Sequence, residues 1–335
     1  MRDQDLLLET HGPFGSGVIG VCDVCGKRQA VIVLKKERFK LCVIDFLNKS
    51  WNAGDPTPGV PLPPYVSERI WFESDFSATG KASAILLTPT KVVRHPIVLV
   101  TPDVFGLTTQ VLDAAIHCAR EGFEVLVPDI GKSAVVGPAD HLSMRLAARF
   151  RGGVPMQSKR TRHLIQFYRD AMEHLRARPM VDPEKSAVVG LSYGGSLAIA
   201  YAAEDQRLSA IALAYPMPVS PPEYLRLLTA PVLLVSPWHD RAANRSRKIF
   251  QSAQKEFKLN VEFAEYVPVG HGFMARDLRQ YDMTVAESAW ERIGQFLRVR
   301  LLPPPPKPPA PPHVVLPAAA TVKPATPASG ATAPA

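Results

Sequence analysis

The sequence predicts a three-layer α/β fold with a mostly parallel central sheet over residues 66–302. Two observations predict it. Short apolar runs rich in β-branched residues alternate with helical patterns of a dozen residues or more, and the apolar runs are nearly continuous. Helices of that length connect parallel strands by right-handed crossovers, and strands covered on both faces lose their polar alternation.

Strands and helices follow one another in a regular order. The expected strands are Arg69–Phe72, Ala84–Leu87, Ile97–Thr101, Val125–Val127, Ala187–Val189, Ala210–Ala214, Val232–Val235 and Val261–Val267. The expected helices are Gln110–Glu121, Lys159–Arg176, Tyr193–Glu204, Asn244–Phe257 and Thr284–Arg300. Gly122 directly follows the first helix, and glycine most readily takes the left-handed conformation found after a helix end.

Proline marks both limits of this region. Residues 55–65 contain five prolines and predict an extended linker, which leaves residues 1–54 as a small N-terminal segment. Residues 303–335 contain twelve prolines, nine alanines and no acidic residue, so we expect a disordered Pro/Ala-rich tail. The run Pro303–Pro312 could bind an aromatic groove of a protein partner, and a purely solubilising tail is the alternative.

Composition excludes several classes of protein. Hydrophobic residues make up 46% and charged residues 21% of the 335, which is typical of a globular protein rather than a fibrous or disordered one. No apolar run reaches the roughly 18 residues of a membrane span, and Met1–Thr10 is too charged for a secretory signal, so we expect a cytoplasmic protein. The net charge of +8 permits anionic partners, but no base-reading pattern accompanies it and nucleic acid is not expected.

The strongest chemical signal is the sequence Gly190-Leu191-Ser192-Tyr193-Gly194-Gly195. It follows an apolar strand and opens a helix, which is the context that a G-x-S-x-G nucleophile turn requires. Small residues on either side allow the backbone to bend sharply and expose the Ser192 hydroxyl. The same turn places the Tyr193 amide at a helix N-terminus, where the potential favours an anion.

A serine hydroxyl becomes a nucleophile when a base takes its proton and an acid orients that base. In α/β-hydrolases, whose nucleophile turn this one resembles, an acid and then a histidine follow the serine in the sequence. Asp240 comes just after the strand Val232–Val235, and His271 follows the strand-like Val261–Val267. We therefore predict that Ser192, Asp240 and His271 form a catalytic triad at the carboxyl ends of strands.

Other residues are alternatives for the same roles. His239, next to the predicted acid, is the alternative base. The alternative carboxylates are Glu262, Glu265 and Asp277, which lie close to the histidine or within the strand before it. The structural alternatives are a tight turn for Ser192, a loop cap or surface carboxylate for Asp240, and a loop histidine with satisfied hydrogen bonds for His271.

A tetrahedral intermediate also needs two amide donors for its oxyanion. One is the amide of Tyr193, and the loop after the strand Ile97–Thr101 offers Val104 as the second. Asp103, directly before it, would then lie near the nucleophile.

Residues 66–302 resemble the dienelactone hydrolase family of α/β-hydrolases. The matching pieces are Asp103-Val104-Phe105-Gly106-Leu107, Gly122-Phe123-Glu124-Val125-Leu126-Val127-Pro128-Asp129, Gly190-Leu191-Ser192-Tyr193-Gly194-Gly195 and His271-Gly272-Phe273. The resemblance implies an α/β-hydrolase fold and hydrolysis of esters or lactones without a cofactor.

The chain departs from the family at three places. The enzymes that name the family carry cysteine where this chain has Ser192, so the resemblance implies a serine-esterase variant. Asp103 stands where a glutamate usually holds the nucleophile. Lys132 and Arg276 are the cations nearest to the positions of the arginines that grip a substrate carboxylate in the family.

The N-terminal segment carries a pattern of its own. Cys22 and Cys25, followed after sixteen residues by Cys42 and then Asp45, have the spacing of a zinc ribbon whose last cysteine is replaced. Three thiolates with Asp45 or His11 would complete a tetrahedral zinc site. A degenerate ribbon without metal is the alternative.

The residues between these cysteines alternate like a β-hairpin. Its strands are expected at Ala30–Leu34 and Arg38–Leu41, around a charged turn.

The function that the sequence favours is hydrolysis of small esters or lactones by a serine hydrolase through an acyl-enzyme. One alternative is a peptidase or acyltransferase with the same triad, because the triad alone does not determine which molecule accepts the acyl group. The other is a non-catalytic adaptor that binds partners through the ribbon and the Pro-rich tail.

Overall fold

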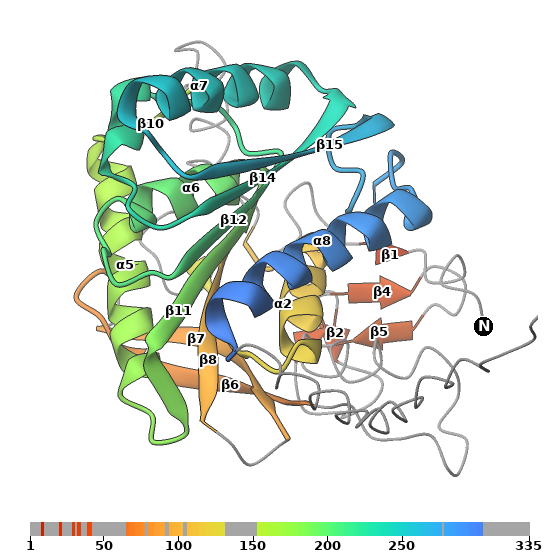
Figure 1. The fold of residues 1–335 in the computed structure, drawn as a ribbon. Helices are drawn as coiled ribbons and strands as arrows, with labels where there is room; N and C mark the ends of the chain where they lie inside the picture. Colours follow the sequence, from red (N-terminus) through yellow and green to blue (C-terminus); the bar gives the residue numbers. More distant parts are fainter. Residues whose placement is uncertain are drawn as a thin grey trace, which may run out of the picture. The chain divides into compact units, whose positions relative to one another are not determined.

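The computed structural model describes residues 65–77, 80–90, 94–102, 106–130, 153–276 and 278–303, together with the backbone of five short strands between residues 8 and 41. The predicted mostly parallel α/β architecture is confirmed (Figure 1).

The centre of the fold is an eight-stranded sheet with the strand order β15-β14-β12-β11-β8-β9-β7-β6. Its strands are β6 (Tyr65–Glu73), β7 (Lys81–Pro89), β8 (His95–Thr101), β9 (Glu124–Pro128), β11 (Val181–Leu191), β12 (Ala210–Ala214), β14 (Val232–His239) and β15 (Val261–Gly270). The first six strands in this order, from β15 to β9, pair in parallel. The strand β7 runs antiparallel to both of its neighbours, β9 and β6.

Helices cover both faces of the sheet. On one face lie α2 (Thr109–Arg120) and α8 (Met283–Leu301), and on the other lie α5 (Lys159–Arg176), α6 (Ser192–Ala202) and α7 (Arg241–Phe257) (Figure 1). Gly122 follows α2 with a φ of +90°, as its position in the sequence predicts.

Alternate residues of each central strand enter two separate hydrophobic cores. In β8, Val98 and Val100 belong to the core under α2 and α8, whereas Ile97 and Leu99 belong to the core under α5, α6 and α7. All four side chains are fully buried. This two-sided burial is the physical reason that the run from Ile97 to Val100 is apolar without interruption.

Some elements differ from the sequence prediction. The helix α7 begins three residues earlier than expected because the Asp240 side chain caps it, accepting bonds from the amides of Ala242 and Ala243. The two-residue strands β10 (Val154–Pro155) and β13 (Val219–Ser220) and the short 3₁₀ helix η2 (Pro222–Leu227) were not predicted. Elements this short carry no periodic signal.

The described N-terminal residues form short strands. They are β1 (Leu8–Glu9), β2 (Gly20–Val21), β3 (Gln29–Ala30), β4 (Ile32–Leu34) and β5 (Phe39–Leu41). The antiparallel pairing of β4 with β5 confirms the predicted hairpin. The predicted zinc ligands Cys22, Cys25, Cys42, Asp45 and His11, and the tail from residue 304, lie outside the described residues.

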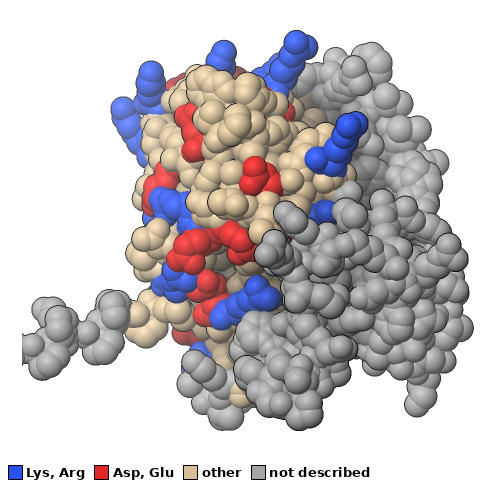
Figure 2. Space-filling view, turned by 90° about the vertical axis from the view of Figure 1, so that its right-hand side faces the viewer, with Lys and Arg blue, Asp and Glu red and all other residues tan. Residues whose placement is uncertain are grey.

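Charge on the described part of one face is mixed. Figure 2 shows Lys and Arg side chains projecting at the upper edge and acidic side chains lower down, interspersed with basic ones. No single stripe of positive charge crosses this part of the face. Within the described ranges, no helix has the length and apolar character to cross a membrane, and no three His, Cys, Asp or Glu side chains are grouped as metal ligands would be.

Truncation of a core side chain in β8 tests this architecture. We expect Leu99→Ala to lower the free energy of unfolding by about 2–5 kcal/mol, because it leaves a cavity in a fully buried strand. Urea unfolding followed by circular dichroism measures the change. Val66→Ala, at a side chain that is 61% exposed, is the control and should change stability by no more than about 0.5 kcal/mol. Equal losses in the two variants would contradict the described burial.

Candidate active site

Ser192 lies at the junction of β11 and α6. The strand β11 ends at Leu191, and Ser192 is the first residue of the helix, with a φ of +53°. A left-handed conformation is uncommon for a residue other than glycine and is typically held in place by the surrounding structure. This is the strained strand-to-helix turn that the G-x-S-x-G pattern predicts.

The glycines around Ser192 are required by close backbone contacts. A Cβ atom on Gly190 would lie 2.6 Å from Thr101 Oγ1, and one on Gly194 would lie 2.7 Å from the carbonyl oxygen of Thr101. A Cβ atom on Gly195 would lie 2.9 Å from Pro216 Cβ. The turn therefore packs directly against the end of β8 on one side and the residues after β12 on the other.

Thr101 is a supporting residue that the sequence analysis missed. It is the last residue of β8, is fully buried, and its hydroxyl lies 2.7 Å from the carbonyl oxygen of Gly194 and 3.2 Å from that of Val189. The contact with Gly194 joins the end of β8 to the first turn of α6. Because the two residues are 93 positions apart, no local pattern indicates the contact.

The structure brings Ser192, His271 and Asp240 together. His271 Nε2 lies 3.0 Å from Ser192 Oγ, and His271 Nδ1 lies 2.5 Å from Asp240 Oδ2. The Asp240 side chain is 5% exposed, whereas that of His271 is 39% exposed. The imidazole is thus accessible from solvent while the carboxylate behind it is shielded.

Asp240 has two structural partners at once. Its Oδ1 atom accepts hydrogen bonds from the amides of Ala242 and Ala243 at the N-terminus of α7, at 2.8 and 3.2 Å, while Oδ2 contacts His271. Burial alone would raise the pKa of this carboxyl, but the hydrogen bond and charge of His271 and the two helix amides outweigh it and lower the pKa. The side chain is therefore an anion at neutral pH.

The alternative acids and the alternative base occupy other positions. Glu262 forms ion pairs with Arg292 and Arg300, and Glu265 pairs with Arg247. Asp277 lies outside the described residues. His239 is exposed at the end of β14, and the hydrogen bonds to Ser192 and Asp240 belong to His271.

Tyr193 is the second residue of α6, in the first helical turn, where amides have no acceptor within the helix and the potential is positive. The second predicted donor, Val104, lies outside the described residues, as do Asp103 and Lys132. Their roles stay predictions.

Arg276 lies five residues after His271 and forms an ion pair with Asp113 of α2. Its Nε atom donates to Asp113 Oδ2 at 2.8 Å, and its Nη2 atom pairs with Oδ1. Asp113 is only 3% exposed. The guanidinium therefore links the loop that carries His271 to α2, and a contact with substrate stays a prediction.

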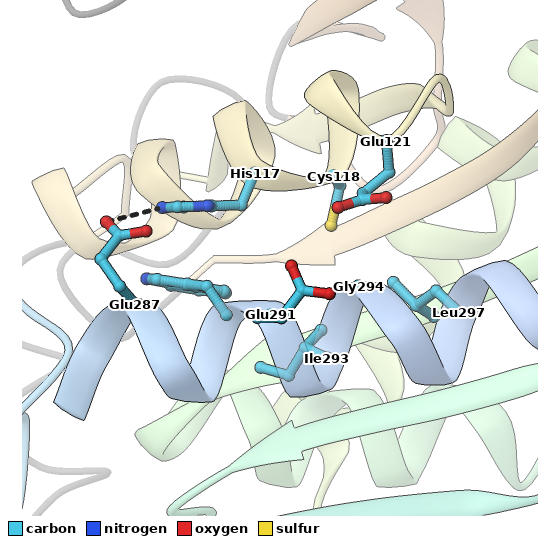
Figure 3. A pocket seen from close by; sticks show the side chains of 9 residues that line it. His117, Cys118, Glu121, Glu287, Glu291, Ile293, Gly294 and Leu297 are labelled. Atoms are coloured by element: carbon cyan, nitrogen blue, oxygen red, sulfur yellow. Dashed lines mark ion pairs between the residues drawn. The ribbon is translucent and has the colours of Figure 1, made fainter. Parts of the chain in front are cut away.

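A small cavity of about 80 Å³ lies between α2 and α8 (Figure 3). His117 stacks on Trp290 in its wall, with ring centroids 4.7 Å apart, and His117 Nε2 lies 3.9 Å from Glu287 Oε1. Burial and the charges of Arg120 and Arg276 lower the pKa of His117 to about 3, so its imidazole is neutral at neutral pH. None of the residues lining this cavity belongs to the hydrogen-bonded group of Ser192, His271 and Asp240.

Comparison with known proteins gives a consistent result. The model of the dienelactone hydrolase family matches residues 82–301. A probable 2-oxo-3-(5-oxofuran-2-ylidene)propanoate lactonase from Bradyrhizobium is 26% identical to the chain over 243 residues, which cover 68% of this chain and 93% of that protein. A Yersinia pestis protein assigned as a carboxymethylenebutenolidase is 24% identical over 213 residues, which cover 59% of this chain and 76% of that protein.

Solved structures show the same fold. A Klebsiella pneumoniae protein assigned as a dienelactone hydrolase aligns with a TM-score of 0.56 at 20% identity, over 69% of this chain and 98% of its own. The likeness shows that the predicted α/β-hydrolase type of fold is correct.

The packing of the nucleophile turn predicts a sharp difference between two glycine substitutions. Gly194→Ala places a Cβ atom 2.7 Å from a backbone oxygen, so we expect it to lower the free energy of unfolding by about 1–3 kcal/mol. In the control, Gly270→Ala, the nearest atom would be 3.4 Å away, and we expect a change of no more than about 0.5 kcal/mol. Thermal and urea unfolding of both variants provide the measurement. An unchanged midpoint for Gly194→Ala would show that the turn does not pack on β8 as described.

Proposed function

The chain belongs to the dienelactone hydrolase family, and from that premise we propose that it is a serine hydrolase that cleaves small carboxylic esters or lactones through an acyl-enzyme. The observation that carries the proposal is the hydrogen-bond chain from Ser192 Oγ through the His271 imidazole to Asp240. Ser192 is the nucleophile, His271 the general base and acid, and Asp240 the residue that orients the imidazole.

In the first step, Ser192 Oγ attacks the substrate carbonyl carbon and its proton passes to His271 Nε2. The 3.0 Å separation of these atoms is within the range for direct proton transfer. The Asp240 carboxylate accepts a hydrogen bond from Nδ1–H of His271, so it fixes the tautomer in which Nε2 carries no proton, and its charge stabilises the imidazolium that forms.

The negative charge that develops on the substrate oxygen requires donors on the other side of the carbonyl. The first turn of α6 supplies the amide of Tyr193, and we propose Val104 as the second donor. The tetrahedral intermediate collapses as His271 gives its proton to the leaving alkoxide, which leaves an acyl group on Ser192. Water, deprotonated by the same imidazole, then attacks the acyl carbon. The bond from that carbon to Ser192 Oγ breaks, His271 returns the proton to Oγ, and the acid leaves.

The substrate class is supported by family membership and by the relatives. The two named above are described as a lactonase and a carboxymethylenebutenolidase. In a lactone the acyl group and the leaving alkoxide belong to one molecule, so the same two steps open a ring. The residues proposed for this chemistry need no cofactor.

Reaction with a fluorophosphonate probe tests the proposal without a guess about the substrate. We expect stoichiometric labelling that peptide mass mapping locates at Ser192, because the probe reacts with serines activated by a base. Turnover of p-nitrophenyl acetate and of a small lactone should accompany it. We expect Ser192→Ala and His271→Ala to abolish both the labelling and the turnover.

Ser209→Ala is the control, since Ser209 directly precedes β12, at the opposite end of that strand from the site, and its hydroxyl donates to the Glu184 carbonyl. It should be labelled at the rate of the unmodified protein. No labelling of folded protein would overturn the assignment and favour the adaptor. Labelling with no ester or lactone turnover would overturn the substrate class and favour a peptidase or acyltransferase.

Because Asp240 both caps α7 and holds His271, two substitutions should distinguish its effect on stability from its effect on activity. Asn caps a helix about as well as Asp, so Asp240→Asn should keep most of the stability, but it cannot hold the imidazole as an anion does. We expect kcat for p-nitrophenyl acetate to fall by about 10³–10⁴-fold in Asp240→Asn. Asp240→Ala should lose similar activity and about 1 kcal/mol more stability. Unfolding midpoints and steady-state kinetics measure the two effects, and full activity of Asp240→Asn would contradict the role of the carboxylate.

A further inference from the structure

We propose that Tyr215 is a positioning residue that fixes the His271 imidazole relative to Ser192, and that Tyr215–Met217 is the common support of the nucleophile and the base. Tyr215 directly follows β12, which lies between β11 and β14 in the sheet. The inference rests on the function proposed above, because it assigns a role in that reaction to a residue outside the triad.

The ring of Tyr215 packs directly against the base. It is fully buried and meets the His271 ring edge to face, with centroids 5.1 Å apart and an interplanar angle of 64°. It packs in the same manner on Phe273, two residues further along, at 5.7 Å. The Tyr215 hydroxyl lies 3.4 Å from Gln110 Oε1 in the first turn of α2.

This contact supplies a constraint that the Asp240 carboxylate cannot supply alone. The hydrogen bond at Nδ1 holds one atom of the imidazole but leaves some rotation about the Cα–Cβ and Cβ–Cγ bonds of His271. A packed aromatic ring beside the imidazole opposes this rotation, and so keeps Nε2 directed at Ser192 Oγ. Misplacement of a reacting group by about 1 Å can reduce a rate by about 10²-fold.

The two residues after Tyr215 hold the nucleophile turn. The Met217 amide donates to the carbonyl oxygen of Ser192 at 3.2 Å, and the Met217 carbonyl accepts from Ser196 Oγ at 2.8 Å. Pro216 packs so closely on the turn that a Cβ atom on Gly195 would lie 2.9 Å from Pro216 Cβ. One three-residue segment thus contacts both the residue that attacks and the residue that takes its proton.

The backbone of Tyr215 has a conformation that serves both contacts. Its amide donates to the Val235 carbonyl at 2.7 Å and so continues the pairing of β12 with β14. Its φ of +40° then turns the chain out of the strand and toward the Ser192 turn. A positive φ is rare for a bulky side chain and persists only where the surroundings fix it, most often at functional sites.

The test compares Tyr215→Leu with Tyr215→Phe in the full-length chain by the second-order rate constant of fluorophosphonate labelling. We expect Tyr215→Leu to label about 10–100-fold more slowly because it removes the ring beside His271. We expect Tyr215→Phe to stay within about threefold of the unmodified protein, since it keeps the ring. With p-nitrophenyl acetate, the loss in Tyr215→Leu should appear in kcat with little change in KM.

The rate constant separates positioning from simple destabilisation. Irreversibly unfolded molecules reduce the extent of labelling but leave the rate constant of the folded ones unchanged, whereas a misplaced imidazole slows every molecule. Phe123→Leu is the matched control: Phe123 is fully buried in the same core but precedes β9 at the opposite end of the sheet. It should lose stability and keep its rate constant. If Tyr215→Leu is not recovered folded, Tyr215→Met replaces it, because Met fills space without an aromatic ring.

The outcomes distinguish this inference from the proposed function. Slow labelling of Tyr215→Leu, with Phe123→Leu and Tyr215→Phe near normal, supports the positioning role. Labelling of Tyr215→Leu at the normal rate, or an equal loss in Tyr215→Phe, overturns it while the proposed function stands. No labelling of the unmodified protein overturns the proposed function and this inference with it.

Discussion

Parallel pairing of four neighbouring strands brings together the three residues of the proposed triad and Tyr215. The strands β11, β12, β14 and β15 are adjacent in the sheet and run in one direction, so their carboxyl ends lie along the same edge. One residue of the site directly follows the end of each strand. In sheet order these are Ser192, Tyr215, Asp240 and His271. Open α/β sheets bind ligands at this edge for the same geometric reason.

The side chain of Asp240 serves both the fold and the candidate site. One carboxylate oxygen caps α7 and the other holds the imidazole, so the helix that covers β14 and the proton path share a single side chain. Ion pairs on either side of His271 also connect the site to the surrounding helices. Arg276 ties the loop after His271 to α2, and Arg247 ties Glu265 of β15 to α7. The histidine loop is held by its neighbours on both faces of the sheet.

Local sequence patterns predicted the parts of this site that depend on local structure. The nucleophile turn could be predicted because glycines at fixed offsets from Ser192 are a steric requirement of the turn itself. Asp240 and His271 could be predicted because an acid and then a histidine follow such a serine in α/β-hydrolases, and because each of the two comes after an apolar run that indicates a strand. Thr101 could not be predicted, because its partner Gly194 is 93 residues away and a threonine at a strand end is unremarkable alone. The Arg276–Asp113 pair joins residues 163 positions apart and is hidden for the same reason.

The left-handed backbone conformations of Ser192 and Tyr215 explain why residues far apart in the sequence must hold the site in place. Each such conformation costs about 1–3 kcal/mol and would relax if nothing opposed it. They follow neighbouring strands, and the hydrogen bond from the Met217 amide to the Ser192 carbonyl joins the two turns. Relaxation of either turn would break that bond and displace the other, so the strain at each is held by the same contact. A chain that keeps a serine exposed on a strained turn therefore needs a second rigid segment beside it, and the end of the neighbouring strand is the nearest place from which to provide one.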